Sequence, residues 1–104
     1  MDMDILGKMG EMQKRMAEIQ TRLEHITVVG EAEGGAVKVT VNGLRQVVNV
    51  EIADALIKEG DKEHIEDLIT TAVNRASEQA ASVAEAESAA AYRDLLPGMP
   101  GLGI

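Results

Sequence analysis

The chain has 104 residues, with ten Lys and Arg against eighteen Asp and Glu, and its formal net charge at pH 7 is −8. It has no Cys, which excludes disulfides and Cys-ligated zinc sites. Tyr92 is its only aromatic residue, so there is almost no side chain on which unpaired nucleic-acid bases could stack. We therefore expect a single small domain that resides in a reducing cytoplasm. Because the chain is acidic overall, any binding to nucleic acid must come from a local basic patch and should be weak and salt-sensitive.

The segment 5–26 predicts a helix of about six turns, because its apolar residues recur at alternating spacings of four and three. These residues, termed the seam, are Ile5, Met9, Met12, Met16, Ile19, Leu23 and Ile26. We expect the helix to bury the seam rather than expose it, against a partner that the pattern does not specify.

The same segment carries Lys8, Arg15 and Arg22 at intervals of seven, so that they form one row beside the seam, termed the basic row. Two interpretations stay open. The basic row can be a solvated flank, since Glu11 and Glu18 each precede an arginine by four residues, the order that favours surface ion pairs on a helix. Otherwise it is a surface for phosphate.

Residues 34–52 predict a β-hairpin. Valines alternate with polar residues from 37 to 41, and Asn42-Gly43 is a dipeptide that favours a two-residue type I′ turn. That turn would place Val37 opposite Val48. One face of the hairpin is then apolar, and its members are Val37, Val39, Val41, Leu44, Val48, Val50 and Ile52.

Residues 27–33 predict a first strand, joined to the hairpin by a tight turn at Gly34-Gly35. In that register Glu31 faces Lys38, and Gly30 lands where a helix could approach the sheet closely. The three strands form an antiparallel meander.

Asp54 is the expected N-cap of a short helical turn that ends at Gly60, and Asp61 is the expected N-cap of a long helix over 62–94. The apolar stripe of that helix thins from Ile and Leu to Ala, so it must lie close to another helix or be partly exposed. We expect one domain over 1–94 and a flexible apolar tail, rich in Pro and Gly, over 95–104.

No pattern indicates catalysis. His25 and His64 lie far apart in no metal-binding spacing, and no apolar run approaches the roughly 18 residues of a membrane span. We therefore expect no enzyme, no metal, no cofactor and no membrane partner.

The order of these segments is similar to that of the YbaB/EbfC family of bacterial nucleoid-associated DNA-binding proteins. The most specific motifs are GGAVKVTVNG at 34–43, IEDLI at 65–69 with Ala72 and Asn74 following, and the Pro-Gly repeats of LLPGMPG at 95–101. The resemblance covers nearly the whole chain. It implies an α+β fold with a heptad helix, a three-stranded meander, a short helical turn and a long C-terminal helix, in a tweezers-shaped homodimer with projecting helical arms that hold DNA.

Carried onto this sequence, the family's helical arms correspond to residues 5–26 and 62–94. The candidate DNA contacts are then Lys8, Lys14, Arg15, Arg22, Arg75 and Arg93. The chain departs from the family pattern after Asn74, where the family is commonly rich in lysine and this chain reads RASEQ over 75–79.

Two functional hypotheses follow. In the first, a homodimer associated with the nucleoid binds duplex DNA mainly through phosphates, with little readout of bases, and influences gene expression or nucleoid organisation. In the second, the chain is a protein-interaction module that binds a protein partner through its Met-rich helix and apolar tail, with little or no DNA binding.

Overall fold

The structure is a computed structural model that describes residues 2–95, with side chains over 4–93. Its elements are, in order, α1 (Asp2–His25), β1 (Thr27–Ala32), β2 (Val37–Asn42), β3 (Val47–Ile52), α2 (Asp54–Glu59) and α3 (Lys62–Leu95). This order confirms the predicted α+β architecture. Leu95, assigned to the tail from sequence, ends α3, and the rest of the expected tail lies outside the described residues.

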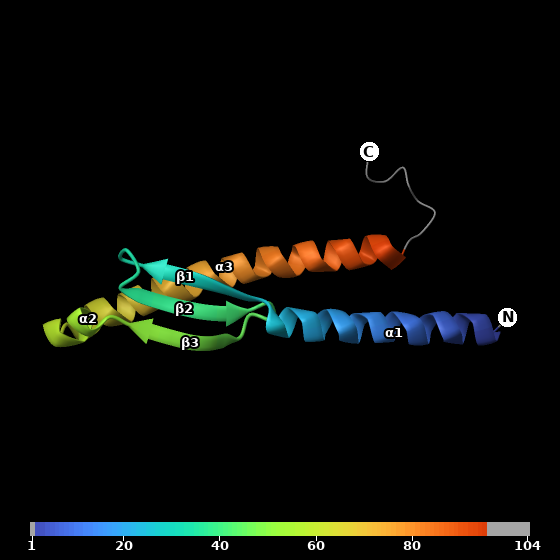
Figure 1. Cartoon of the computed structure of the whole chain (residues 1–104), viewed down its shortest axis with the longest axis horizontal. Helices are drawn as coiled ribbons and strands as arrows, with labels where there is room; N and C mark the ends of the chain where they lie inside the picture. Colours follow the sequence, from blue (N-terminus) through green and yellow to red (C-terminus); the bar gives the residue numbers. More distant parts are fainter. Residues whose placement is uncertain (1, 96–104) are drawn as a thin grey trace, which may run out of the picture.

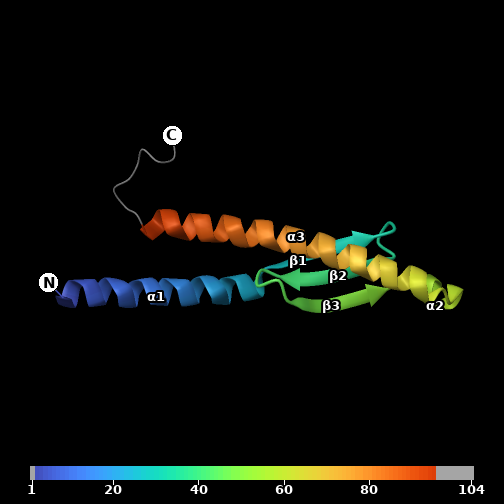
Figure 2. The same cartoon turned by 180° about the vertical axis from the view of Figure 1, so that it is seen from behind.

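The molecule is long and narrow, with principal extents of 68 × 30 × 16 Å. The sheet and α2 occupy one end, while α1 and the second half of α3 run side by side away from the sheet (Figure 1). Seen from behind, α3 crosses the sheet before it continues alongside α1 (Figure 2). No helix among the described residues is both long enough and apolar enough to cross a membrane.

The sheet is the predicted antiparallel meander, with strand order β1-β2-β3. The register of β1 on β2 is as expected, since Glu31 pairs with Lys38 and Gly30 pairs with Val39. Gly34 and Gly35 connect the strands with φ of 66° and 93°, values that favour glycine. The expected tight turn is confirmed.

The predicted register of β2 on β3 is wrong. Val37 pairs with Ile52 rather than with Val48, and a bulge follows at Thr40/Val41. The connection is therefore four residues long, from Gly43 to Gln46, instead of two. Because the displacement along β3 is four residues, an even number, Val50 and Ile52 remain on the face to which they were assigned.

The longer connection has a physical cause in the side chain of Asn42, which is buried. Its Oδ1 accepts hydrogen bonds from the backbone N–H groups of Leu44 and Gln46, both at 3.0 Å. The next residue, Gly43, donates its N–H to the carbonyl oxygens of Leu23 and Ile26 at the end of α1. The Asn-Gly pair therefore anchors α1 to the sheet instead of forming a two-residue turn.

The core lies between α3 and the first two strands. Val37, Val39 and Val41 are fully buried, and three alanines spaced by four along α3, Ala72, Ala76 and Ala80, are buried against them. Gly30 confirms the predicted close approach, because a Cβ there would overlap the backbone of α3.

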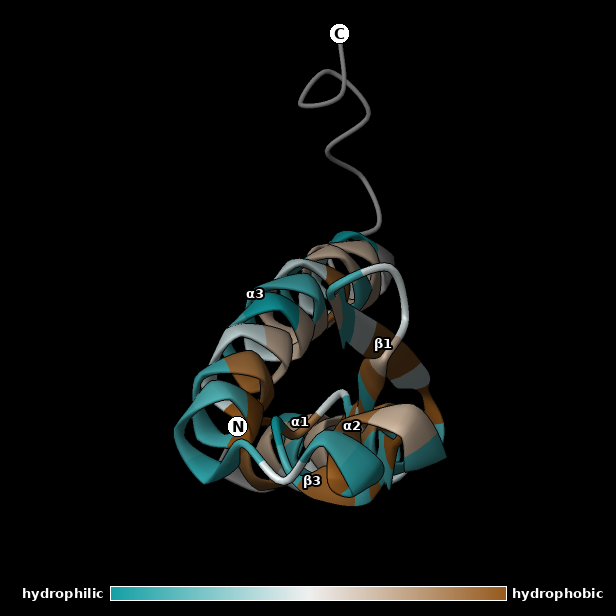
Figure 3. Cartoon of the chain, turned by 90° about the vertical axis from the view of Figure 1, so that its left-hand side faces the viewer, coloured by the Kyte–Doolittle hydropathy of each residue, from teal (hydrophilic) through white to brown (hydrophobic). Residues whose placement is uncertain are grey.

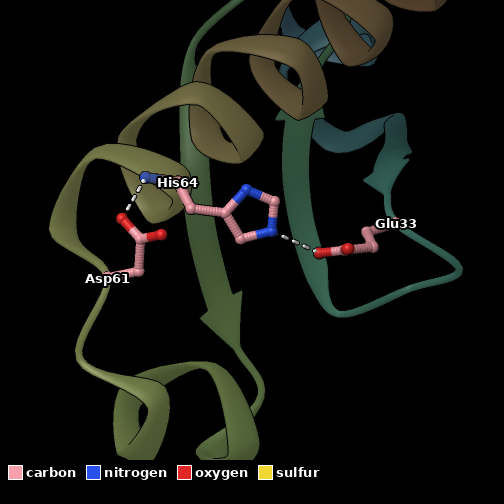
Figure 4. Close-up of polar contacts among 3 residues, drawn as sticks. All are labelled: Glu33, Asp61 and His64. Atoms are coloured by element: carbon pink, nitrogen blue, oxygen red, sulfur yellow. Dashed lines mark hydrogen bonds and ion pairs between the residues drawn. The ribbon is translucent and has the colours of Figure 1, made fainter.

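The start of α3 is fixed by two polar contacts (Figure 4). Oδ1 of Asp61 accepts the backbone N–H of His64 at 3.1 Å, which confirms Asp61 as the N-cap. Nε2 of His64 lies 2.9 Å from Oε2 of Glu33 and so connects α3 to the β1–β2 turn. Asp54 was wrongly predicted as a cap, since α2 begins at Asp54 itself and its N-cap, Ala53, makes no side-chain bond. Gly60 ends α2 with φ of 70°, as expected.

The prediction that the seam is buried is wrong for a single chain. Only Leu23 is buried, and Ile19 and Ile26 are half-buried. The remaining four seam residues, Ile5, Met9, Met12 and Met16, are 50–58% exposed. The second half of α3 runs alongside α1, but it leaves the side chains of these four residues exposed.

A second apolar surface lies on β3, the strand furthest from β1. Val47, Val48 and Val50 are 42–53% exposed, whereas the valines of β2 are buried under α3. Figure 3 shows this end of the molecule, with α2 and the sheet, coloured by hydropathy. One chain thus leaves both the seam and the β3 edge uncovered.

Candidate nucleic-acid interface

The basic row lies along α1, the helix that projects from the sheet. Successive members are seven residues apart, which is about 10 Å along a helix axis. Lys8 is exposed on the half of α1 far from the sheet, Arg15 is half-buried near the middle, and Arg22 lies in the last turns before the sheet. The row therefore follows the length of the arm.

A groove between α1 and α3 is lined by two members of the basic row, Arg15 and Arg22. It encloses a cavity of about 380 Å³. Its lining from α1 is Arg15, Glu18, Ile19 and Arg22, and its lining from α3 is Ala86, Glu87, Ala90 and Ala91. The α3 wall thus consists of small apolar side chains and one carboxylate.

One ion pair crosses this groove. Nε of Arg22 lies 3.3 Å from Oε2 of Glu87, and no other ion pair joins the two arms among the side chains over 4–93. The pairs expected from the solvated-flank interpretation, Glu11 with Arg15 and Glu18 with Arg22, are not formed in that same part of the chain. The sequence separation of Arg22 and Glu87 explains why the pattern along α1 could not reveal this contact.

The three candidates outside the basic row, Lys14, Arg75 and Arg93, do not line the groove, and neither does Lys8. Lys14 borders a shallow hollow on α1, together with Thr21 and His25. Arg93 is exposed in the last turn of α3. Nη1 of Arg75 donates to the carbonyl oxygen of Glu31 at 2.8 Å, so this arginine lies against the sheet, about 27 Å from Arg93 along the helix axis. The structure does not bring Arg75 together with the α1 cations.

Arg45 is a further cation near the arms that was not among the candidates from sequence. It lies in the β2–β3 connection with φ of 66°, and its Nη2 and Nε approach Oγ of Ser77 at 3.1 and 3.3 Å. The connection also contains Gly43, which is bonded to the end of α1. Arg45 therefore adds a positive charge near the base of the arms.

No metal centre was found in the described region, where no three His, Asp or Glu side chains are grouped closely enough to hold an ion. Asp61 caps α3 and His64 contacts Glu33, while Nδ1 of His25 lies 2.8 Å from the carbonyl oxygen of Thr21.

Several known proteins are similar to this chain over most of its length. The model of the YbaB/EbfC DNA-binding family matches residues 1–95. A protein of Bartonella bacilliformis named as nucleoid-associated is 40% identical over 101 residues, covering 97% of this chain and 93% of its own. A nucleoid-associated protein of Flavobacterium johnsoniae is 33% identical over 100 residues, covering 96% and 92%.

The fold also has a solved counterpart. The crystal structure of an uncharacterized protein from Helicobacter pylori superposes with a TM-score of 0.71 at 24% identity, covering 88% of this chain and 94% of that one. This likeness concerns the fold alone. The family match over residues 1–95, together with the identity to the curated relatives, shows that the chain belongs to the YbaB/EbfC DNA-binding family.

Proposed function

We propose that this chain binds duplex DNA without catalysing a reaction on it, as a nucleoid-associated protein of the bacterial cytoplasm. The names of its family and relatives support DNA as the partner. The observation that carries the proposal is the basic row, three cations at seven-residue intervals on a helix that projects from the sheet (Figure 1).

Phosphate contact is the chemistry that suits this arm. Residues 5–26 hold four cations and three carboxylates, in a chain whose net charge is −8. Such a local patch binds by releasing condensed counterions, and overall repulsion keeps its affinity in the micromolar range of non-specific association at low salt. Within residues 2–95, no short recognition helix presents a set of Asn, Gln and Arg to base edges, so we expect binding to depend little on DNA sequence. Binding of this kind influences nucleoid organisation or gene expression through occupancy of DNA.

The candidate cations contribute unequally in this proposal. Lys8, Arg15, Arg22 and Arg93 lie on the projecting arms and are proposed to contact phosphates directly. Lys14 adds charge from an adjoining face of α1. Arg75 contributes least, because its guanidinium is already bonded to the backbone of β1.

The functional unit is proposed to be a homodimer. Two surfaces of one chain support this, the exposed valines of β3 and the exposed seam of α1. An edge strand with free backbone donors and acceptors and apolar side chains is a template for pairing with another strand. A second copy would cover the β3 edge and present a second pair of arms to the duplex.

A protein-interaction module remains the alternative, and one observation favours it. Met9, Met12 and Met16 are exposed together on α1, and methionine forms adaptable apolar surfaces that suit several partners. In this alternative a protein partner, rather than DNA, occupies the arms.

The DNA-binding function and the protein-interaction function can be distinguished by changing the charge of the basic row. We propose fluorescence anisotropy on labelled duplex DNA at low salt, with Lys8→Glu compared with Lys58→Glu. Both substitutions make the same change in net charge at exposed lysines, but Lys58 lies on α2 at the opposite end of the molecule. We expect Lys8→Glu to weaken DNA binding by the arms more than Lys58→Glu does, whereas equal effects would contradict a role for the basic row.

A further inference from the structure

The ion pair between Arg22 and Glu87 lies where the arm is proposed to meet phosphate. The side chain of Arg22 is 70% exposed, while that of Glu87 is 26% exposed. The guanidinium therefore remains accessible from solvent, and the carboxylate that neutralises it is partly shielded between the helices.

A carboxylate and a phosphate compete for the same donors. Both accept charge-assisted hydrogen bonds from a guanidinium, and arginine suits either anion. While Oε2 of Glu87 holds Nε of Arg22, a phosphate gains less from this arginine than from an unneutralised cation.

The groove makes Glu87 a specific competitor rather than one negative charge among many. It is the only charged residue that α3 contributes to the lining, where its neighbours are alanines. Glu85, two residues earlier on the same helix, is exposed and does not line the groove.

We propose that Glu87 is an intramolecular phosphate mimic that lowers the affinity of the arms for DNA by occupying Arg22. This inference rests on the proposed function, because it requires that Arg22 contact phosphate. DNA binding then includes exchange of a carboxylate for a phosphate at Arg22, and it releases the one ion pair seen between the arms among the described side chains.

The expected effect is modest. Exposed ion pairs contribute little in water, so neutralising Glu87 should tighten DNA binding by roughly two- to fivefold. Neutralising any carboxylate near the arms also reduces general repulsion from DNA. The informative quantity is therefore the difference in DNA affinity between the Glu87→Gln and Glu85→Gln variants, because both substitutions make the same change in charge on the same helix.

The test is fluorescence anisotropy with the full chain and a labelled duplex at one fixed low ionic strength. The variants are Glu87→Gln, Glu85→Gln, Arg22→Gln and the double variant Arg22→Gln/Glu87→Gln, each checked for folding by circular dichroism. We expect Glu87→Gln to bind two- to fivefold more tightly than Glu85→Gln, and we expect Glu87→Gln to have no such effect when Arg22 is already Gln.

Two results would overturn the proposal while leaving DNA binding intact. One is equal affinity of Glu87→Gln and Glu85→Gln. The other is an affinity gain from Glu87→Gln that persists in the Arg22→Gln background, which would assign the gain to general electrostatics. If the folded wild-type chain and every variant fail to bind DNA at low salt, the proposed function fails, and the competition at Arg22 fails with it.

Discussion

Gly30 of β1 and Ala76 of α3 meet backbone to backbone, and a Cβ built on Gly30 would lie 2.9 Å from the Cα of Ala76. This contact sets the distance between the long helix and the sheet. It explains why the fully buried residues of α3 are alanines, since larger side chains at those positions would hold the helix away from the fully buried valines of β2.

Gly30→Ala should therefore destabilise the fold by about 1–3 kcal/mol, because the backbone of α3 must move to admit the methyl group. Thermal or urea unfolding monitored by circular dichroism measures this change. Gly7→Ala is the matched control, since nothing lies within 4 Å of a Cβ at Gly7 and alanine favours the helix. Equal unfolding free energies for the two variants would contradict the close approach of α3.

Val39→Asp should cost several kcal/mol of stability, since it places an unpaired carboxylate at a fully buried position of the central strand. Asn49→Asp, at an exposed position of β3, should change stability by no more than about 0.5 kcal/mol. Chemical denaturation of both variants provides the comparison. An unaltered melting temperature for Val39→Asp would mean that the two faces of the sheet have been assigned the wrong way round.

The two parts of α1 should respond differently to truncation. Leu23→Ala should cost about 2–4 kcal/mol, because Leu23 is buried where α1 meets the sheet. Met12→Ala should reduce the free energy of unfolding of a single chain much less, because Met12 is 50% exposed. Denaturation at protein concentrations low enough to favour monomers isolates the effect on the single chain, and similar losses at both positions would show that the seam is buried after all.

Val48→Lys should weaken self-association without unfolding the chain. Val48 is 53% exposed on β3, so lysine costs little in the monomer, whereas at a dimer interface it buries charge. Sedimentation velocity at micromolar concentration would then give a dimer mass for the wild type and a shift toward monomer for Val48→Lys. A wild-type chain that sediments as a clean monomer would rule out the proposed homodimer.

Local patterns in the sequence were sufficient for much of this fold. The first helix, the Gly34-Gly35 turn, the cap at Asp61 and the close approach at Gly30 each depend on a few neighbouring residues, and the structure confirms them. The β2–β3 register was not predictable in the same way, because the side chain of Asn42 and the bonds from Gly43 to α1 form only in the folded chain.

The candidate interface was predictable only in part. The spacing of Lys8, Arg15 and Arg22 follows from the sequence, but the partner of Arg22 is Glu87, 65 positions away, and no helical periodicity connects them. The seam shows a similar limit. Its periodicity identifies one face of α1, and the structure shows that α3 does not cover most of that face.

The most direct test of the account is the salt dependence of duplex DNA binding, measured by anisotropy over a range of salt concentrations for the wild type and for charge reversals of the basic row. We expect weak, sequence-independent binding at low salt, and we expect Lys8→Glu and Arg15→Glu each to reduce the slope of log K against log[salt] by about one, with folding intact. Screening of the repulsion from a chain of net charge −8 should make every slope shallower than the number of contacts suggests. If the folded wild-type protein shows no binding to duplex DNA at low salt, the basic row is a solvated flank, and the protein-interaction alternative replaces the DNA-binding account.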